Sequence, residues 1–199
     1  MLRNIYDFNT RTPPKNLGYA NYFIVLENKY EKTKKITGVE IKPKTVNELN
    51  KQVKKFKNAN FIILTTQDYE IKRKAVDNSL VDAIAHNELE KKRSKRNYRY
   101  SGIDHVIAKK CAENNVSVNI CFNDFLNAEN RGIILGRMKQ NVRLCLKYGA
   151  PIIISSGAEK TSELVPPDNL TAFAEFLGMN RKQSLESVSR VAEKIIKRK

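Results

Sequence analysis

The chain has 199 residues, 41% of them apolar, so it is long enough to bury a core and its composition argues against a disordered tail. Its 37 Lys and Arg residues against 21 Asp and Glu residues give a formal net charge of +16, which attracts polyanions and repels other basic proteins. No apolar run approaches the roughly 20 residues that cross a bilayer, and the segment 1–9 lacks the basic-then-apolar pattern of a secretion signal. Nucleic acid is therefore the leading class of partner, and no membrane contact is expected.

Seven short apolar runs predict β-strands. Several of these runs are apolar throughout, which is typical of strands covered on both faces. The predicted strands span residues 5–8, 22–26, 37–41, 61–65, 81–85, 116–120 and 151–155. Longer segments of helical period lie between them, and this alternation favours parallel strands joined by helical crossovers.

Five helices are predicted from apolar residues at helical spacing and from capping residues. The first spans 45–56, with Thr45 and Glu48 as a capping box at its start. The other four are a helix from Gly102 to about 114–115, a helix over 131–148 that stops at Gly149, a helix capped by Asp168 and closed by Gly178, and a last helix opened by Asn180.

An α/β fold follows from this order, either as an open doubly wound sheet or as a closed barrel. A full eight-unit barrel usually needs about 250 residues, so a barrel of this length must be small or incomplete. The sequence contains neither an internal repeat nor a linker, and we expect one domain spanning 1–199.

Residues suited to catalysis or metal binding are few. The three cysteines, Cys111, Cys121 and Cys145, have no CxxC spacing, which predicts buried thiols in a reducing cytoplasm and neither disulfides nor a zinc site. The two histidines, His86 and His105, belong to no ligand-spaced cluster, and no nucleotide-binding or hydrolase motif is present. We therefore assign no catalytic residue and no metal ligand from the sequence.

Two carboxylates keep an alternative open. Asp7 and Asp82 lie in the first and fifth predicted strands, where they could approach a barrel mouth. Together with His86 or His105 they could surround a metal in a stand-alone phosphoesterase. Carboxylates without identifiable partners are more typical of structural roles, so this function is the second choice.

The segment 90–105 is strongly basic. Its six cations are offset only by Glu90 and Asp104, and Tyr98 and Tyr100 are placed among them. Arginine can hold phosphate with two hydrogen bonds and tyrosine can stack on unpaired bases, so the segment is a candidate RNA contact or, alternatively, a solvated surface loop. The candidate residues are Lys91, Lys92, Arg93, Lys95, Arg96 and Arg99, with His105 as a further phosphate donor.

The predicted helix 131–148 carries a second basic surface. Lys139, Arg143 and Lys147 recur every four residues, with Arg137 nearby and Arg131 at the helix start. Such a stripe is often only a solvated face, but this segment contains no Asp or Glu to offset the charge. The turn 155–160 also follows directly on a strand and suits an anion-binding loop with Lys160, although small residues also make simple turns.

Three blocks in the second half of the chain carry a family resemblance. They are GIDHVIAKKCAENN, RMKQNVRLCLKYGAPIIISSGA and the LGM before the last predicted helix. In this order, over about 82–189, the sequence resembles protein component 3 of archaeal ribonuclease P, whereas the first 80 residues fit only in strand order.

The resemblance implies a TIM-barrel-like fold with seven parallel strands and outer helices, related to the polymerase and histidinol phosphatase barrels. It also implies a subunit without catalysis of its own, in a ribonucleoprotein whose RNA uses Mg²⁺ to remove the 5′ leader of precursor tRNA. The implied partners are the RNA subunit, the other ribonuclease P proteins and especially protein component 2, which pairs directly with component 3. The phosphatase relatives have a metal-binding histidine motif at the first strand, where this chain has Asp7 and then Asn9 in place of a histidine.

Overall fold

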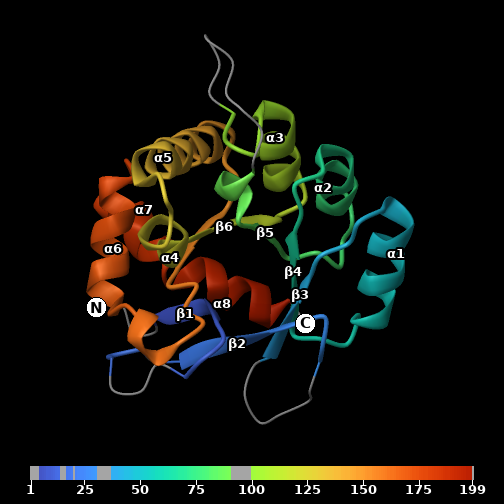
Figure 1. Cartoon of the computed structure of the whole chain (residues 1–199), viewed down its shortest axis with the longest axis horizontal. Helices are drawn as coiled ribbons and strands as arrows, with labels where there is room; N and C mark the ends of the chain where they lie inside the picture. Colours follow the sequence, from blue (N-terminus) through green and yellow to red (C-terminus); the bar gives the residue numbers. More distant parts are fainter. Residues whose placement is uncertain (1–4, 14–16, 20, 31–36, 91–99, 199) are drawn as a thin grey trace.

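Seven parallel strands form one sheet in sequence order, from β1 to β7 (Figure 1). The structure is a computed structural model that describes residues 5–13, 17–19, 21–30, 37–90 and 100–198. The strands are β1 Tyr6–Thr10, β2 Asn21–Glu27, β3 Thr37–Ile41, β4 Phe61–Thr65, β5 Ala83–Ala85, β6 Ser117–Cys121 and β7 Ile152–Ser155. All seven predicted strands are confirmed, and their ends differ from the predicted ones by at most two residues. The fold is the α/β, TIM-barrel-like arrangement that the sequence favoured.

Helices surround this sheet, with α1, α2, α3, α5 and α6 on its outside (Figure 1). The helices are α1 Val46–Lys55, α2 Tyr69–Val76, α3 His105–Glu113, α4 Phe122–Leu126, α5 Arg131–Tyr148, α6 Pro167–Phe176, α7 Arg181–Ser187 and α8 Arg190–Lys197, with 3-10 turns η1 Asn87–Leu89 and η2 Thr161–Glu163. Helices α2 and α4 were missed because both are short and lack a long apolar period. No helix among the described residues is long and apolar enough to span a bilayer.

Two predictions at the C-terminal end were wrong. Asp168 does not cap α6, because Pro166 occupies the N-cap and Asp168 lies in the first turn. The fixed φ of Pro167 suits the first helical position, and an acidic residue there complements the helix dipole. The single last helix is instead two, with α7 ending before Val188 and α8 beginning at Arg190. The predicted cap at Asn180 is confirmed, since its side chain accepts from the backbone N–H of Gln183.

The barrel closes between β1 and β7 without a strand-to-strand ladder in the described residues. Instead, the carboxylate of Asp7 accepts hydrogen bonds from the backbone N–H and the hydroxyl of Ser156, directly after β7. The backbone N–H of Arg11 donates to the carbonyl of Ala158 at 2.8 Å. A side chain and a loop therefore complete the seam that a strand pair would otherwise make.

The interior of the barrel is apolar toward the amino ends of the strands. Phe8, Phe23 and Phe61 pack there with ring centroids 4.6 to 5.9 Å apart. Gly38 makes room for them, because a Cβ at this position would lie 2.1 Å from the ring of Phe61. Ala192 and Ile195 of α8 belong to the same buried cluster, so α8 packs its apolar face against this interior. Outside the strands, a larger apolar cluster fills the space beneath the helices.

The inward positions become polar toward the carboxyl ends of the strands. The polar inward residues are Glu40 in β3, Thr65 in β4, Asn119 and Cys121 in β6, and Ser155 in β7. Side chains alternate along a strand, so these residues share the inner face with the aromatic layer. The barrel therefore has an apolar interior and a polar mouth, and loops and helix ends surround that mouth.

Candidate nucleic-acid interface

Helix α5 presents the basic stripe that the sequence predicts. Lys139, Arg143 and Lys147 are exposed, while Met138, Val142 and Cys145 on the opposite face are buried. The amino group of Lys139 lies 4.2 Å from the ring centroid of the exposed Phe176 in α6. No Asp or Glu occurs in α5, so no acidic side chain of the helix itself neutralises the stripe.

Arg137 does not belong to this exposed stripe, and its assignment as an RNA contact is corrected. The residue is 8% exposed, and its guanidinium donates to the carbonyls of Glu88 and Glu90 at 2.8 and 2.6 Å. Arg137 lies two residues before Lys139, so its side chain points to the other side of the helix. Arg137 is thus a buried structural cation.

The six cations between Lys91 and Arg99 lie outside the described residues, but the two ends of this segment are described. Glu90 is 5% exposed and accepts from the hydroxyl of Tyr100 at 2.8 Å. The buried amino group of Lys72 donates to the same Glu90 carboxylate at 3.3 Å and to the carbonyl of Gly102. Tyr100, predicted to stack on bases or lie against the domain, is therefore bonded within the fold.

Further contacts hold the same two chain ends together. The side chain of Asn141 in α5 donates to the carbonyl of Ser101 at 2.9 Å. Gly102 has a φ of +87°, and a Cβ there would lie 1.8 Å from the carbonyl oxygen of Asn87. We call the set Lys72, Glu90, Tyr100, Gly102, Arg137 and Asn141 the loop stem. It ties both ends of the basic segment to the inner side of α5.

The three remaining candidate residues lie in different parts of the structure. His105 is exposed and is the first residue of α3, whose N-cap is Asp104. Arg131 is exposed, but its guanidinium donates to the carbonyl of Leu126 at 2.8 and 3.1 Å. Lys160 is exposed at the start of η2, on the loop that follows β7.

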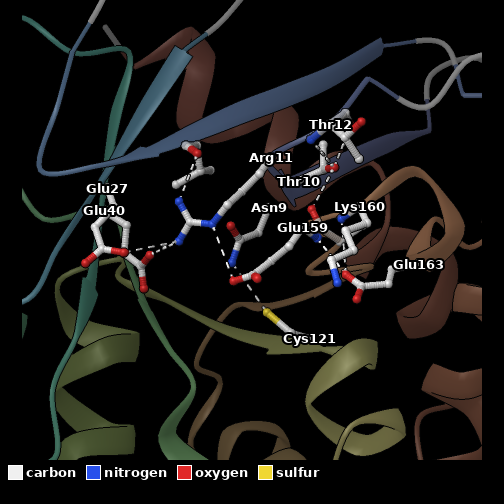
Figure 2. Close-up of polar contacts among 12 residues, drawn as sticks. Asn9, Thr10, Arg11, Thr12, Glu27, Glu40, Cys121, Glu159, Lys160 and Glu163 are labelled. Atoms are coloured by element: carbon white, nitrogen blue, oxygen red, sulfur yellow. Dashed lines mark hydrogen bonds and ion pairs between the residues drawn. The ribbon is translucent and has the colours of Figure 1, made fainter.

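Helix α5 packs against both α3 and η1, the described elements on either side of the basic segment (Figure 1). The loop stem holds the chain at Glu90 and again at residues 100–102, and the stripe lies on the other face of α5. His105 begins α3, the helix that packs against α5. Lys160 stands apart from them, near acidic side chains at the barrel mouth (Figure 2).

The barrel mouth itself contains a network of opposite charges (Figure 2). The guanidinium of Arg11 forms ion pairs with Glu40 and Glu27, and the amino group of Lys42 lies 2.8 Å from Glu27. The hydroxyl of Thr65 donates to Glu40 at 2.6 Å. Burial raises the pKa of Glu40, but His86, Thr65 and the nearby cations outweigh it and hold this pKa below its usual range.

His86 lies at the same mouth, directly after β5, with a left-handed φ of 55°. Its Nδ1 is 2.7 Å from a carboxylate oxygen of Asp124 in α4. Burial lowers the pKa of His86, but the charges of Asp124 and Glu40 and the bond to Asp124 outweigh it and raise the pKa to about 9. Burial and then the charge of Asp124 raise the pKa of Cys121 well above that of a free thiol.

The residues of the alternative phosphoesterase are not brought together. Asp7 is bonded to Ser156, Asp82 accepts from the backbone N–H of Ile62 at 2.8 Å, and His105 lies outside the barrel on α3. Among the described residues, the one cluster of three metal-binding groups is His86, Cys121 and Asp124. The geometry therefore does not favour the phosphoesterase arrangement.

The sequence model of the RNase P subunit p30 family matches residues 4–199. The chain belongs to this family. It is 30% identical over 165 residues to ribonuclease P protein component 3 of Methanococcus maripaludis (strain C7), a match that covers 80% of this chain and 68% of the relative. It is also 30% identical over 162 residues to the protein of the same name from Methanosarcina acetivorans, with 80% of this chain and 64% of the relative covered.

A solved structure supports the same relationship. A chain in the cryo-EM structure of archaeal ribonuclease P with mature tRNA superposes with a TM-score of 0.82 at 25% identity. The match covers 96% of this chain and 90% of that chain. The family resemblance inferred from the three sequence blocks is therefore confirmed, and so is the fold that it implied.

Sequence reasoning missed most of the loop stem. Lys72 and Asn141 have no distinctive local motif, because each bonds to residues 18 or more positions away along the chain. Lys72, among the apolar residues of segment 69–76, was the one available signal. A lysine on a buried helix face is rarely unpaired, so it indicates an acidic partner elsewhere in the fold. His86 was considered only for the alternative function.

Proposed function

We propose that this subunit of ribonuclease P holds the RNA of the enzyme against the exposed stripe of α5 and the basic segment 91–99. The observation that carries the proposal is the position of the stripe beside the loop stem, on a helix without a single acidic residue. Uncompensated cations repel one another and so weaken a helix, and phosphates would remove this cost. His105 and Arg131 extend the same surface, whereas Arg137 supports it from inside.

The mechanism is electrostatic and architectural. Lysine and arginine side chains neutralise phosphates where RNA strands approach one another and release condensed counterions. The RNA then needs less Mg²⁺ to reach its active geometry, and that Mg²⁺ is bound by the RNA and not by this chain. Phosphate contacts position an RNA without reading its bases, so recognition depends on shape.

The wider assembly follows from the family. We propose that the chain pairs directly with protein component 2, joins the other ribonuclease P proteins and supports removal of the 5′ leader from precursor tRNA. The cytoplasm is the proposed compartment, in agreement with three buried free thiols.

Neutralising the stripe tests this proposal. We expect the triple variant Lys139→Gln, Arg143→Gln, Lys147→Gln in the reconstituted holoenzyme to need about two- to fivefold more Mg²⁺ for half-maximal cleavage, because lost counterion release must be replaced. Thermal unfolding of the isolated subunit should stay within about 2 °C of the unchanged protein, since exposed side chains contribute little to stability.

A matched control separates local contact from total charge. Lys51→Gln, Lys54→Gln, Lys57→Gln removes the same three charges from exposed positions in and after α1, a helix on another part of the barrel. This control should leave the Mg²⁺ requirement unchanged. An equal increase in the Mg²⁺ requirement of the two triple variants would contradict an interface at α5. Charge reversal at Arg93, Arg96 and Arg99 tests the basic segment by the same assay.

A further inference from the structure

Three side chains with metal-binding atoms converge at the barrel mouth, away from the basic surface. They are His86 after β5, Cys121 at the end of β6 and Asp124 in the first turn of α4. One ligand atom of each, an imidazole nitrogen, the thiol sulfur and a carboxylate oxygen, lies within 4.8 Å of the other two. Neighbouring parallel strands end at the same edge of the sheet, which is why residues 35 positions apart meet here.

Two side-chain amides lie against the sulfur of Cys121. The amide nitrogens of Asn9 and Asn119 donate to the sulfur of Cys121 at 3.4 and 3.5 Å. The hydroxyl of Ser155 donates to the side-chain carbonyl of Asn119 at 2.9 Å and so holds that amide in place. Donors around a thiolate are typical of the groups that orient and tune a metal ligand. Gly157 leaves the space for this sulfur, because a Cβ there would lie 2.7 Å from Cβ of Cys121.

Glu88 is a buried carboxyl close enough to interact electrostatically with His86 and Asp124. Its carboxylate is fully buried, and neither oxygen has a hydrogen-bond partner among the described residues. Burial and then the charge of Asp124 raise the pKa of Glu88 to about 8, although His86 and Lys72 lower it. A bound cation would offset the cost of burying this carboxyl in its ionised form.

A path from solvent reaches the cluster. A cavity of about 180 Å³ is lined by His86 and Asp124 together with Asn123, Gly157, Glu159 and Glu163. A small hydrated cation could enter through it, and the two glutamates would attract that cation. Entry route, ligand types and surrounding donors are the features expected of a metal site.

We propose that His86, Cys121 and Asp124 bind a divalent cation of the zinc class. Sulfur, imidazole and carboxylate together favour Zn²⁺ or Co²⁺ over Mg²⁺, which prefers oxygen ligands alone. This differs from our expectation from the sequence that the chain holds no metal, and it assigns no hydrolytic step.

The site has a structural consequence for the basic surface. His86 directly precedes η1, and the carbonyl of Glu88 within that turn accepts from Arg137 of the loop stem. A cation on His86 would therefore fix the turn from which the basic segment departs. The proposal does not depend on RNA binding, and its test uses the isolated full chain.

Cobalt titration gives a direct readout of the thiolate ligand. Metal-depleted, reduced protein should develop a near-ultraviolet sulfur-to-cobalt charge-transfer band and tetrahedral visible bands at one equivalent of Co²⁺. Added Zn²⁺ should abolish these bands and raise the temperature of unfolding. A folded protein without these bands would overturn the proposal.

Variants locate the ligand. Cys121→Ser should abolish the charge-transfer band, and His86→Gln should weaken Co²⁺ binding about 100-fold or more, because even outer-shell changes cost about 10- to 100-fold. Cys111→Ser and Cys145→Ser remove the two other buried thiols and should leave the band intact. A band that persists in Cys121→Ser would place the metal elsewhere, and circular dichroism of each metal-free variant checks its folding. Full-affinity Co²⁺ binding by folded His86→Gln would equally contradict the assignment.

Discussion

At the residue scale, Asp7 has a role that its residue type does not predict. In sequence it was a candidate metal or catalytic carboxylate, but in the structure it joins β1 to the loop after β7. It is completely buried, and burial raises its pKa from 3.8 to about 6 even though the hydrogen bonds from Ser156 lower it. The seam of the barrel is therefore held by a carboxylate that binds its proton more tightly in the folded state.

This linkage predicts a pH-dependent stability. Because the pKa is higher in the folded than in the unfolded chain, the contribution of Asp7 to the free energy of unfolding is greatest below pH 3.8 and falls as the pH rises through 6. The full loss corresponds to about 3 kcal/mol. Asp7→Asn should remove it, so the variant should be more stable than the unchanged protein at pH 7.5 and lose this advantage near pH 4.

Urea unfolding at several pH values gives the free energy of unfolding of Asp7→Asn and of the unchanged protein. Other titrating groups affect both proteins equally, so they cancel in the difference between the two free energies. Asp7→Ala serves as the contrast, because it leaves the backbone N–H of Ser156 without its acceptor and should destabilise the protein at every pH. A stability difference between Asp7→Asn and the unchanged protein that does not vary with pH would mean that Asp7 titrates as an ordinary carboxyl.

At the scale of an element, the sequence of helix α5 predicts its buried and exposed faces but not the role of every residue. Its period predicted correctly which face is buried and which face carries Lys139, Arg143 and Lys147. The period could not assign Arg137, because that residue lies at the border between the faces and its role depends on η1. Two arginines of one helix thus perform different tasks, one in the loop stem and one at the surface.

Single substitutions in α5 should separate these tasks. Arg137→Met should lower the free energy of unfolding by about 2 to 3 kcal/mol, since two buried carbonyls lose a charged donor. Arg143→Met should change it by less than about 0.5 kcal/mol but weaken RNA binding and reduce its salt dependence. Urea unfolding and filter binding to ribonuclease P RNA measure the two effects. Matched stability losses in both variants would contradict the buried role of Arg137.

At the scale of the whole molecule, the excess of 16 positive charges is distributed unevenly. Acidic residues gather at the barrel mouth around Arg11 and His86, whereas α5 has none. A total charge alone would attract any polyanion to any face. The fold converts that charge into one surface suited to RNA and a separate mouth suited to a cation.

Binding to ribonuclease P RNA should therefore depend strongly on salt and weakly on base identity. We expect the affinity to fall at least about tenfold between roughly 0.1 and 0.5 M monovalent salt, because each neutralised phosphate contributes to counterion release. The triple variant of the α5 stripe should reduce the slope of log affinity against log salt by about 2, and the α1 control should not. An affinity that salt leaves unchanged would contradict an electrostatic interface.

The sequence by itself determined the seven strands, most helices, the basic character and the family, because apolar period, helix caps and the three family-like blocks are local properties of the chain. It could not predict that Arg137 is buried, that Tyr100 bonds to Glu90, or that His86, Cys121 and Asp124 meet. Those contacts join residues brought together only by strand order, strand register and the closing of the barrel. The tertiary structure thus decided which charges are free to bind a partner and which hold the protein together.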